Sequence, residues 1–245
     1  MAQLNKAADR ADRRGNVPFQ LSFVRSQDSE TPPPLARLIQ GGRGGEVRLK
    51  LYLSITMMAT AAPYDLRRPP TPQTWARMLA LPPDTGPRRV SSNLRWLSKN
   101  NFIELSPRPG NTALIKLLPM DPGGVPYVRA STQGRYVGIP IEFWKRGWII
   151  HLSATGIAVL FALLEAQGGY KEPRYLTRER RDSYGFSHAT WTEATKELQR
   201  HEFLTVRREA QGSDFDYQRL RNLYWVDEGR FTDHPWTPAP EGSSR

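Results

Sequence analysis

The feature that most constrains this chain is an internal repeat. Residues 88–105 and residues 189–206 both have the pattern of a helix that ends at polar residues and continues at once into an apolar strand. At a single offset of 101 residues the apolar positions of the two segments coincide, pairing Leu97 with Leu198, Phe102 with Phe203, Ile103 with Leu204 and Leu105 with Val206. A repeat of this length indicates two copies of one structural unit.

Length and charge agree with this interpretation. A chain of 245 residues is long enough for two domains of about 100 residues each. It carries 35 Lys and Arg against 24 Asp and Glu, a formal net charge of +11. The excess is clustered near the repeated segments, at Arg67-Arg68, Arg88-Arg89, residues 178–181 and Arg207-Arg208. Clustered positive charge favours a polyanionic partner over a uniformly charged surface.

Several function classes are excluded or disfavoured by composition. The chain has no Cys, which excludes disulfides, thiol catalysis and Cys-ligated metal sites and permits a reducing compartment. The apolar stretches 49–62 and 157–166 are shorter than the roughly 18 residues of a membrane span. The charged N-terminus lacks the apolar segment of a signal peptide. We therefore expect a cytoplasmic, nucleoid-associated protein that does not bind membranes.

Enzymatic motifs are missing from the sequence. It contains no Gly-x-x-x-x-Gly-Lys-Ser/Thr phosphate loop, and residues 41–45 do not match the dinucleotide-binding pattern. The four histidines, at positions 151, 188, 201 and 234, are too scattered to indicate a metal site. No nucleophile has a base beside it. The sequence thus predicts a protein that is not an enzyme and needs no metal or cofactor.

The order of predicted elements is the same in both halves. Residues 1–34 are polar and are expected to form a disordered basic arm, in which residues 19–23 can dock as a strand. In the first domain, residues 35–120, we expect a buried helix with Arg48 and Lys50 toward solvent, two further helices and a hairpin, over residues 46–61, 73–81, 88–101 and 102–118.

A Pro- and Gly-rich linker over residues 121–126 separates the two predicted domains. The second domain, residues 127–228, is expected to begin with a short strand and then to form three helices and a hairpin, over residues 136–141, 154–167, 176–183, 187–201 and 203–226. Ser153 or Thr155 caps the first of these helices. Residues 229–245 are expected to be a disordered tail.

Three helices followed by a hairpin, present twice, resemble the winged helix-turn-helix superfamily in tandem arrangement. The layout is similar to that of bacterial plasmid replication initiators and two-winged regulators, over roughly residues 36–228. The resemblance implies an α+β fold of two winged-helix domains, each a three-helix core with a β-hairpin wing. It also implies double-stranded DNA as a partner, although winged helices serve as protein-binding modules as well.

The first predicted recognition helix carries a basic face without acidic residues. Val90, Leu94 and Leu97 share one side of this helix. The residues expected on its DNA-facing surface are Arg88, Arg89, Ser91, Ser92, Arg95 and Lys99. An Arg side chain matches the O6 and N7 acceptors of guanine, and Ser can contact base edges or phosphate. A charged helix face is more often simply solvated, but here no acidic residue balances it.

The second recognition helix and the wings add weaker candidates. Trp191, Ala194 and Leu198 are expected to face inward, and Glu193 interrupts the basic surface. The candidate contacts on this helix are His188, Thr190, Thr192, Lys196, Gln199 and Arg200. The candidate contacts on the wings are Arg108 and Asn111 in the first unit and Arg207, Arg208 and Arg219 in the second. The acidic-aromatic loop 214–217 fits a protein partner as well as DNA.

The sequence predicts site-specific binding of double-stranded DNA, by a transcription regulator or a replication or maintenance factor of a mobile element. The alternative is a structural adaptor that uses winged-helix domains to hold a protein. The sequence leaves open whether the protein forms a homodimer or binds a protein partner through its second domain.

Overall fold

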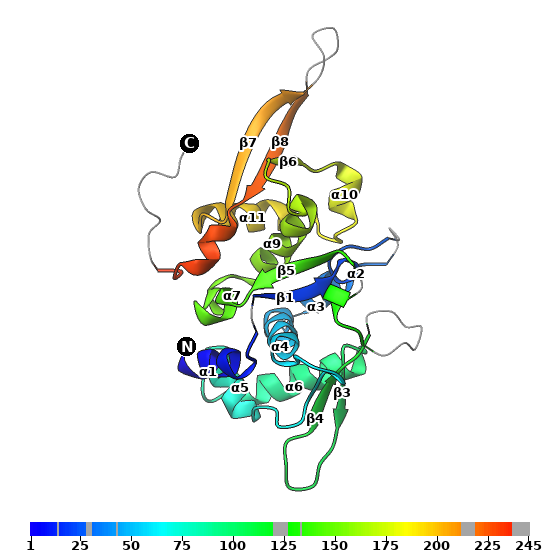
Figure 1. The fold of residues 1–245 in the computed structure, drawn as a ribbon, viewed down its shortest axis with the longest axis vertical. Helices are drawn as coiled ribbons and strands as arrows, with labels where there is room; N and C mark the ends of the chain where they lie inside the picture. The colour runs from blue at the N-terminus through cyan, green and yellow to red at the C-terminus, as the bar shows by residue number, and fades with distance from the viewer. Residues whose placement is uncertain are drawn as a thin grey trace.

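The fold is a mixed α and β architecture built from short elements (Figure 1). The computed structural model describes residues 1–13, 15–27, 31–42, 44–119, 127–132, 134–211 and 219–236. Within these ranges there are eleven α-helices, two 3₁₀-helices and three small antiparallel sheets. In the same ranges, no helix is both long enough and apolar enough to cross a bilayer.

Two units in the chain share one order of elements. The first unit contains α4 (Gly45–Met58), β2 (Asp65–Leu66), α5 (Pro72–Met78), α6 (Gly86–Lys99), β3 (Ile103–Ser106) and β4 (Leu114–Leu117). The second unit contains α9 (Ala154–Gln167), β6 (Arg174–Tyr175), α10 (Arg178–Asp182), α11 (His188–Arg200), β7 (Leu204–Gln211) and β8 (Arg219–Val226). Their sheets have the equivalent strand orders β2-β4-β3 and β6-β8-β7. The repeat inferred from sequence is therefore also a repeat of topology.

The repeat extends to the backbone between helix and strand. Asn101 and Glu202, 101 residues apart, both adopt a left-handed conformation, with φ of 60° and 61°. In both units the next residue donates its amide back to the helix, Phe102 N to Leu97 O and Phe203 N to Leu198 O, each at 2.9 Å. A positive φ is uncommon for a residue with a β-carbon. Its recurrence at equivalent positions shows that both helices end in the same turn.

The N-terminal segment differs from the predicted disordered arm. It forms α1 (Ala2–Arg10), β1 (Asn16–Gln20), α2 (Leu21–Val24) and, after residues 28–30, α3 (Pro34–Ile39). Strand β1 pairs antiparallel with β5 (Tyr136–Pro140), so the expected docking of residues 19–23 occurs partly as a strand and partly as a helix. The segment is polar on average, but its few apolar side chains are buried by surfaces far away in sequence.

Two phenylalanines of this segment join the two units. The Phe23 ring stacks on Tyr52 of α4 at 5.4 Å between centroids and meets Phe161 of α9 edge-on at 6.3 Å. Phe19 lies 5.1 Å from the same Phe161 ring. The buried apolar residues of both units belong to one continuous cluster. The two units therefore pack on each other through one shared hydrophobic core. Two domains joined only by a flexible linker would each have a separate core.

The central helices α4 and α9 are buried on nearly all sides. Helix α9 has the predicted bounds, and Ser153 caps it by accepting from Gly156 N at 3.0 Å. The expectation that Arg48 and Lys50 face solvent is wrong. Lys50 bonds Glu46 and the Ile150 carbonyl, and Arg48 lies 4.2 Å over the Trp96 ring. Each buried cation thus interacts with a group on a neighbouring helix, Lys50 with Ile150 and Arg48 with Trp96. A helical-wheel projection of α4 alone does not include these partners.

The second unit is extended by short helices at both of its ends. Helices α7 (Glu142–Lys145) and α8 (Trp148–His151) precede α9, and the 3₁₀-helix Glu228–Thr232 follows β8. Residues 229–236, expected to belong to a disordered tail, are ordered. The Phe231 ring is buried 4.9 Å from Phe203, and the Trp148 indole donates to Asp233 O at 2.9 Å. The predicted linker 121–126 and the tail beyond Trp236 lie outside the described residues.

Candidate nucleic-acid interface

Helix α6 is positioned by close packing against α5. Thr71 caps α5 by accepting from Thr74 N at 3.2 Å, as its Thr-Pro sequence predicts. Gly86 begins α6 so close to the preceding helix that an added β-carbon would lie 2.9 Å from the β-carbons of Ala76 and Leu81. The two helices therefore meet at a spacing that only glycine allows.

The predicted faces of α6 are confirmed. Val90 and Leu97 are buried, and Leu94 packs against the core. Exposed side chains occupy the opposite face, at Arg88, Arg89, Ser92, Arg95 and Lys99. Ser91 is half-buried and donates its hydroxyl to Pro87 O at 3.0 Å, so it is less accessible than expected. The helix holds no acidic residue, and its exposed cations have no counter-charge on their own element.

Helix α11 presents a more neutral surface. Trp191, Ala194 and Leu198 are buried as predicted. Lys196 pairs with Glu193 at 2.8 Å, and this hydrogen bond lowers the pKa of the Glu193 carboxyl. The Glu193 carboxylate thus offsets the charge of Lys196. The exposed candidate residues that remain on the helix are His188, Gln199 and Arg200.

The two threonine candidates of α11 already make local hydrogen bonds. The Thr190 hydroxyl lies 2.9 Å from the Ser187 hydroxyl at the helix cap. The Thr192 hydroxyl donates to His188 O at 2.9 Å. The Thr192 hydroxyl has thus used its one proton, and the Thr190 hydroxyl is already part of the helix cap. The polar side chains of α11 are therefore more engaged in local bonds than the exposed cations of α6.

The wing candidates lie on the two hairpins. Arg108 and Asn111 are exposed in the turn between β3 and β4, and Arg108 Nη1 donates to Arg67 O, which ties this turn to the chain beyond β2. Arg207 and Arg208 are exposed on β7. Arg219 begins β8, opposite Gln211 in the ladder. The loop 214–217 lies outside the described residues.

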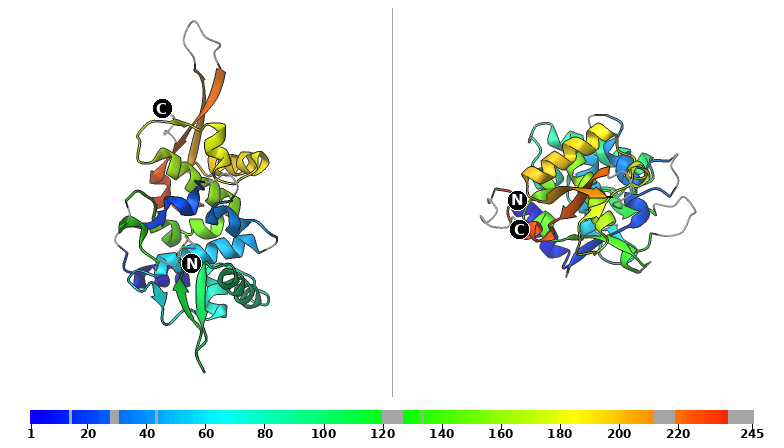
Figure 2. Two further views of the ribbon diagram at one scale, coloured as in Figure 1. Left: turned by 90° about the vertical axis from the view of Figure 1, so that its right-hand side faces the viewer. Right: turned by 90° about the horizontal axis from the view of Figure 1, so that it is seen from above.

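The two units place their third helices on one side of the molecule. Figure 2 (left) shows α6 and α11 along the same side of the body, while the hairpins β3–β4 and β7–β8 project from opposite ends. Figure 1 shows the two-stranded sheet of β1 and β5 between the units.

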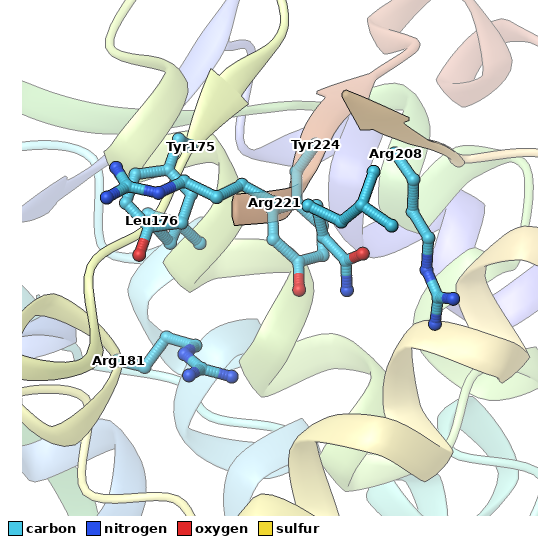
Figure 3. A pocket seen from close by; sticks show the side chains of 8 residues that line it. Tyr175, Leu176, Arg181, Arg208, Arg221 and Tyr224 are labelled. Atoms are coloured by element: carbon cyan, nitrogen blue, oxygen red, sulfur yellow. The ribbon is translucent and has the colours of Figure 1, made fainter. Parts of the chain in front are cut away.

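The sequence did not indicate a groove beside the second hairpin. It lies between α10, β6 and the hairpin β7–β8, and three arginines line it (Figure 3). Of its lining residues only Arg208 belongs to the predicted contacts. Among the described residues, no three His, Asp or Glu side chains gather as a metal site would require.

Comparison of the chain with models of known protein families, with curated proteins and with solved structures finds no match.

Proposed function

We propose that the protein binds double-stranded DNA at specific sites through two winged-helix units. Each unit has the order helix, strand, helix, helix, hairpin, with the last strand in the centre of its sheet. A helix-turn-helix with a following hairpin offers the third helix to the major groove and the hairpin to the flanking backbone. In this proposal α6 and α11 are the third helices of the two units.

The exposed face of α6 is the observation that carries this proposal. Its Arg and Lys side chains project from a helix of 14 residues, about 21 Å long at 1.5 Å per residue. The major groove is about 12 Å wide and accepts one helix. We assign Arg88 and Arg95 to base edges, because both are exposed on the side opposite the buried Val90 and Leu97.

The second unit has a supporting role in this proposal. The Glu193–Lys196 pair leaves α11 with less net positive charge than α6. We assign Arg200, Arg207 and Arg208 to phosphates, which increase affinity at any sequence. Because both units share one core, the distance between their two DNA contacts is fixed. A transcription regulator and a replication or maintenance factor of a mobile element both need such binding.

The test measures affinity by fluorescence anisotropy on a selected duplex and on a random duplex over a series of salt concentrations. Neutralising about six phosphates reduces affinity about a thousandfold between 50 and 200 mM salt. Arg88→Ala and Arg95→Ala are expected to cost about 1–3 kcal/mol on the selected duplex and less on the random one. Arg10→Ala, on α1 outside the repeated units, is the matched control and leaves both affinities unchanged.

Wild-type protein that fails to bind duplex, or binds with an affinity that salt does not change, contradicts the proposal. That outcome favours the structural adaptor, in which the same units hold a protein partner. Equal losses on both duplexes for Arg88→Ala and Arg95→Ala would reassign these residues from bases to phosphates.

A further inference from the structure

The groove beside the second hairpin has the size and lining of a ligand site. Its volume is about 440 Å³, within the range of sites that hold small ligands or parts of larger ones. The side chains that line it come from four segments of the chain: Tyr175, Leu176, Arg181, Arg208, Leu220, Arg221, Asn222 and Tyr224. Figure 3 shows these side chains around one shared space.

The charge of the groove points to an anionic ligand. Arg181 from α10, Arg208 from β7 and Arg221 from β8 contribute guanidinium groups, and no described acidic side chain lines the groove. The Arg181 Nε is buried without a hydrogen-bond partner among the described residues. Asp182, the acid next to Arg181 in the chain, pairs with Arg178 at 3.7 Å.

The groove also contains a stacked platform. The Arg221 guanidinium lies 4.4 Å over the Tyr175 ring, and the pairing of β6 with β8 fixes the strands that carry the two side chains. A second pair of the same kind precedes it in the chain, with Arg174 4.1 Å over the exposed Tyr170 ring. Unpaired bases stack on aromatic rings and on guanidinium planes.

We propose that this groove binds one nucleotide of a single-stranded nucleic acid. The two phosphates that flank this nucleotide lie at Arg181 and at Arg208, and its base stacks on the Tyr175–Arg221 platform. A base inside a duplex is stacked on both faces and cannot occupy such a platform, so the strand must be unpaired. This activity uses none of the α6 residues. It shares Arg208 with the duplex contacts assigned above, so the variants that test it are placed at Tyr175 and Arg181.

The test measures binding of a fluorescein-labelled oligothymidylate of about 12 nucleotides, a length within the site sizes of such grooves, to the full chain. Tyr175→Leu keeps apolar volume but removes the ring, and Arg181→Gln removes one charge. Tyr175→Leu is expected to weaken binding about 5- to 150-fold, the range for loss of one base stack. Arg181→Gln is expected to weaken binding and to reduce its salt dependence, because it removes a phosphate contact. Melting temperatures check that each variant folds.

Two conservative variants serve as controls. Tyr175→Phe keeps the ring and is expected to retain affinity. Arg178→Gln removes an Arg from the same helix as Arg181, but this side chain is 84% exposed and paired with Asp182 outside the groove, so affinity is retained. An oligouridylate of the same length, measured in parallel, assigns the strand to DNA or RNA according to which probe binds more tightly.

Measuring duplex binding and strand binding for the same variants distinguishes this proposal from the proposed function. Arg88→Ala and Arg95→Ala are expected to weaken duplex binding and leave oligothymidylate binding unchanged, and the groove variants are expected to do the reverse. Groove variants that weaken duplex binding as much as strand binding would make the groove part of the duplex interface and overturn the proposal. Unchanged strand binding in both Tyr175→Leu and Arg181→Gln would also overturn it.

Discussion

Replacing Phe23 by Ala tests whether the N-terminal segment joins the two units. The Phe23 ring is 2% exposed, stacks on Tyr52 of the first unit and contacts Phe161 of the second. Truncation of a buried Phe to Ala costs about 3–5 kcal/mol. Since aromatic pairs add about 0.5–1.5 kcal/mol beyond burial, we expect a loss of about 4 kcal/mol, a large part of the 5–15 kcal/mol that stabilises a typical domain.

The assay is urea unfolding followed by tryptophan fluorescence and by circular dichroism. Phe23→Ala is expected to lower the free energy of unfolding while both probes report one shared transition, because both units lose contacts. Tyr136→Ala, which truncates an exposed aromatic side chain on β5, is the control and costs less than about 1 kcal/mol. A loss below 1 kcal/mol for Phe23→Ala, or two separate transitions in the wild type, would refute the shared core.

Three further changes test other parts of the structure. Glu165→Gln removes the buried carboxylate that accepts from Arg180 at 2.6 Å and from the Tyr184 hydroxyl at 2.7 Å. The Arg180 side chain is 32% exposed and can be solvated once the carboxylate is removed. We therefore expect the free energy of unfolding, measured in urea, to fall by about 1.5–3 kcal/mol. An unchanged free energy of unfolding would show that the ion pair does not contribute to stability. Gly86→Ala pushes α6 away from α5, and we expect the free energy of unfolding to fall by about 1–3 kcal/mol. We also expect weaker duplex binding, measured by anisotropy. Wild-type values for both quantities would disprove the close approach of the two helices. Cleavage at a protease site introduced into residues 121–126 is expected to leave the two fragments associated in gel filtration, and their separation would indicate independent domains.

The sequence predicts the parts of the fold that repeat or that have clear periodicity. The offset of 101 residues identifies equivalent helices and strands, and the buried faces of α6 and α11 follow from helical spacing. Strands β2 and β6 have two residues each and show no periodicity, so the sheets were predicted as hairpins and are three-stranded. Comparing equivalent positions of the two units therefore predicts their helices and longer strands, but a strand of two residues is too short to show a pattern.

The N-terminal segment and the groove depend on contacts that no local pattern contains. Phe19 and Phe23 are buried by α4 and α9, which begin more than 20 residues further along the chain. The groove combines Tyr175 and Arg181 with residues of the second hairpin. Each of these residues alone resembles an ordinary surface residue. Their convergence is a consequence of the fold. The sequence indicated Arg208 as a contact and Arg181 as part of a basic cluster, but no local pattern predicted that the two residues line one groove.

Hydroxyl-radical footprinting on a duplex selected from a random pool tests the central claim most directly. Because α6 and α11 lie on one side of the molecule and their units share one hydrophobic core, wild-type protein is expected to protect two segments on one face of the duplex at a constant separation. Arg88→Ala combined with Arg95→Ala is expected to erase one of the two segments and leave the other. A single protected segment that the double variant leaves intact, or no protection at all, would contradict DNA recognition by these helices.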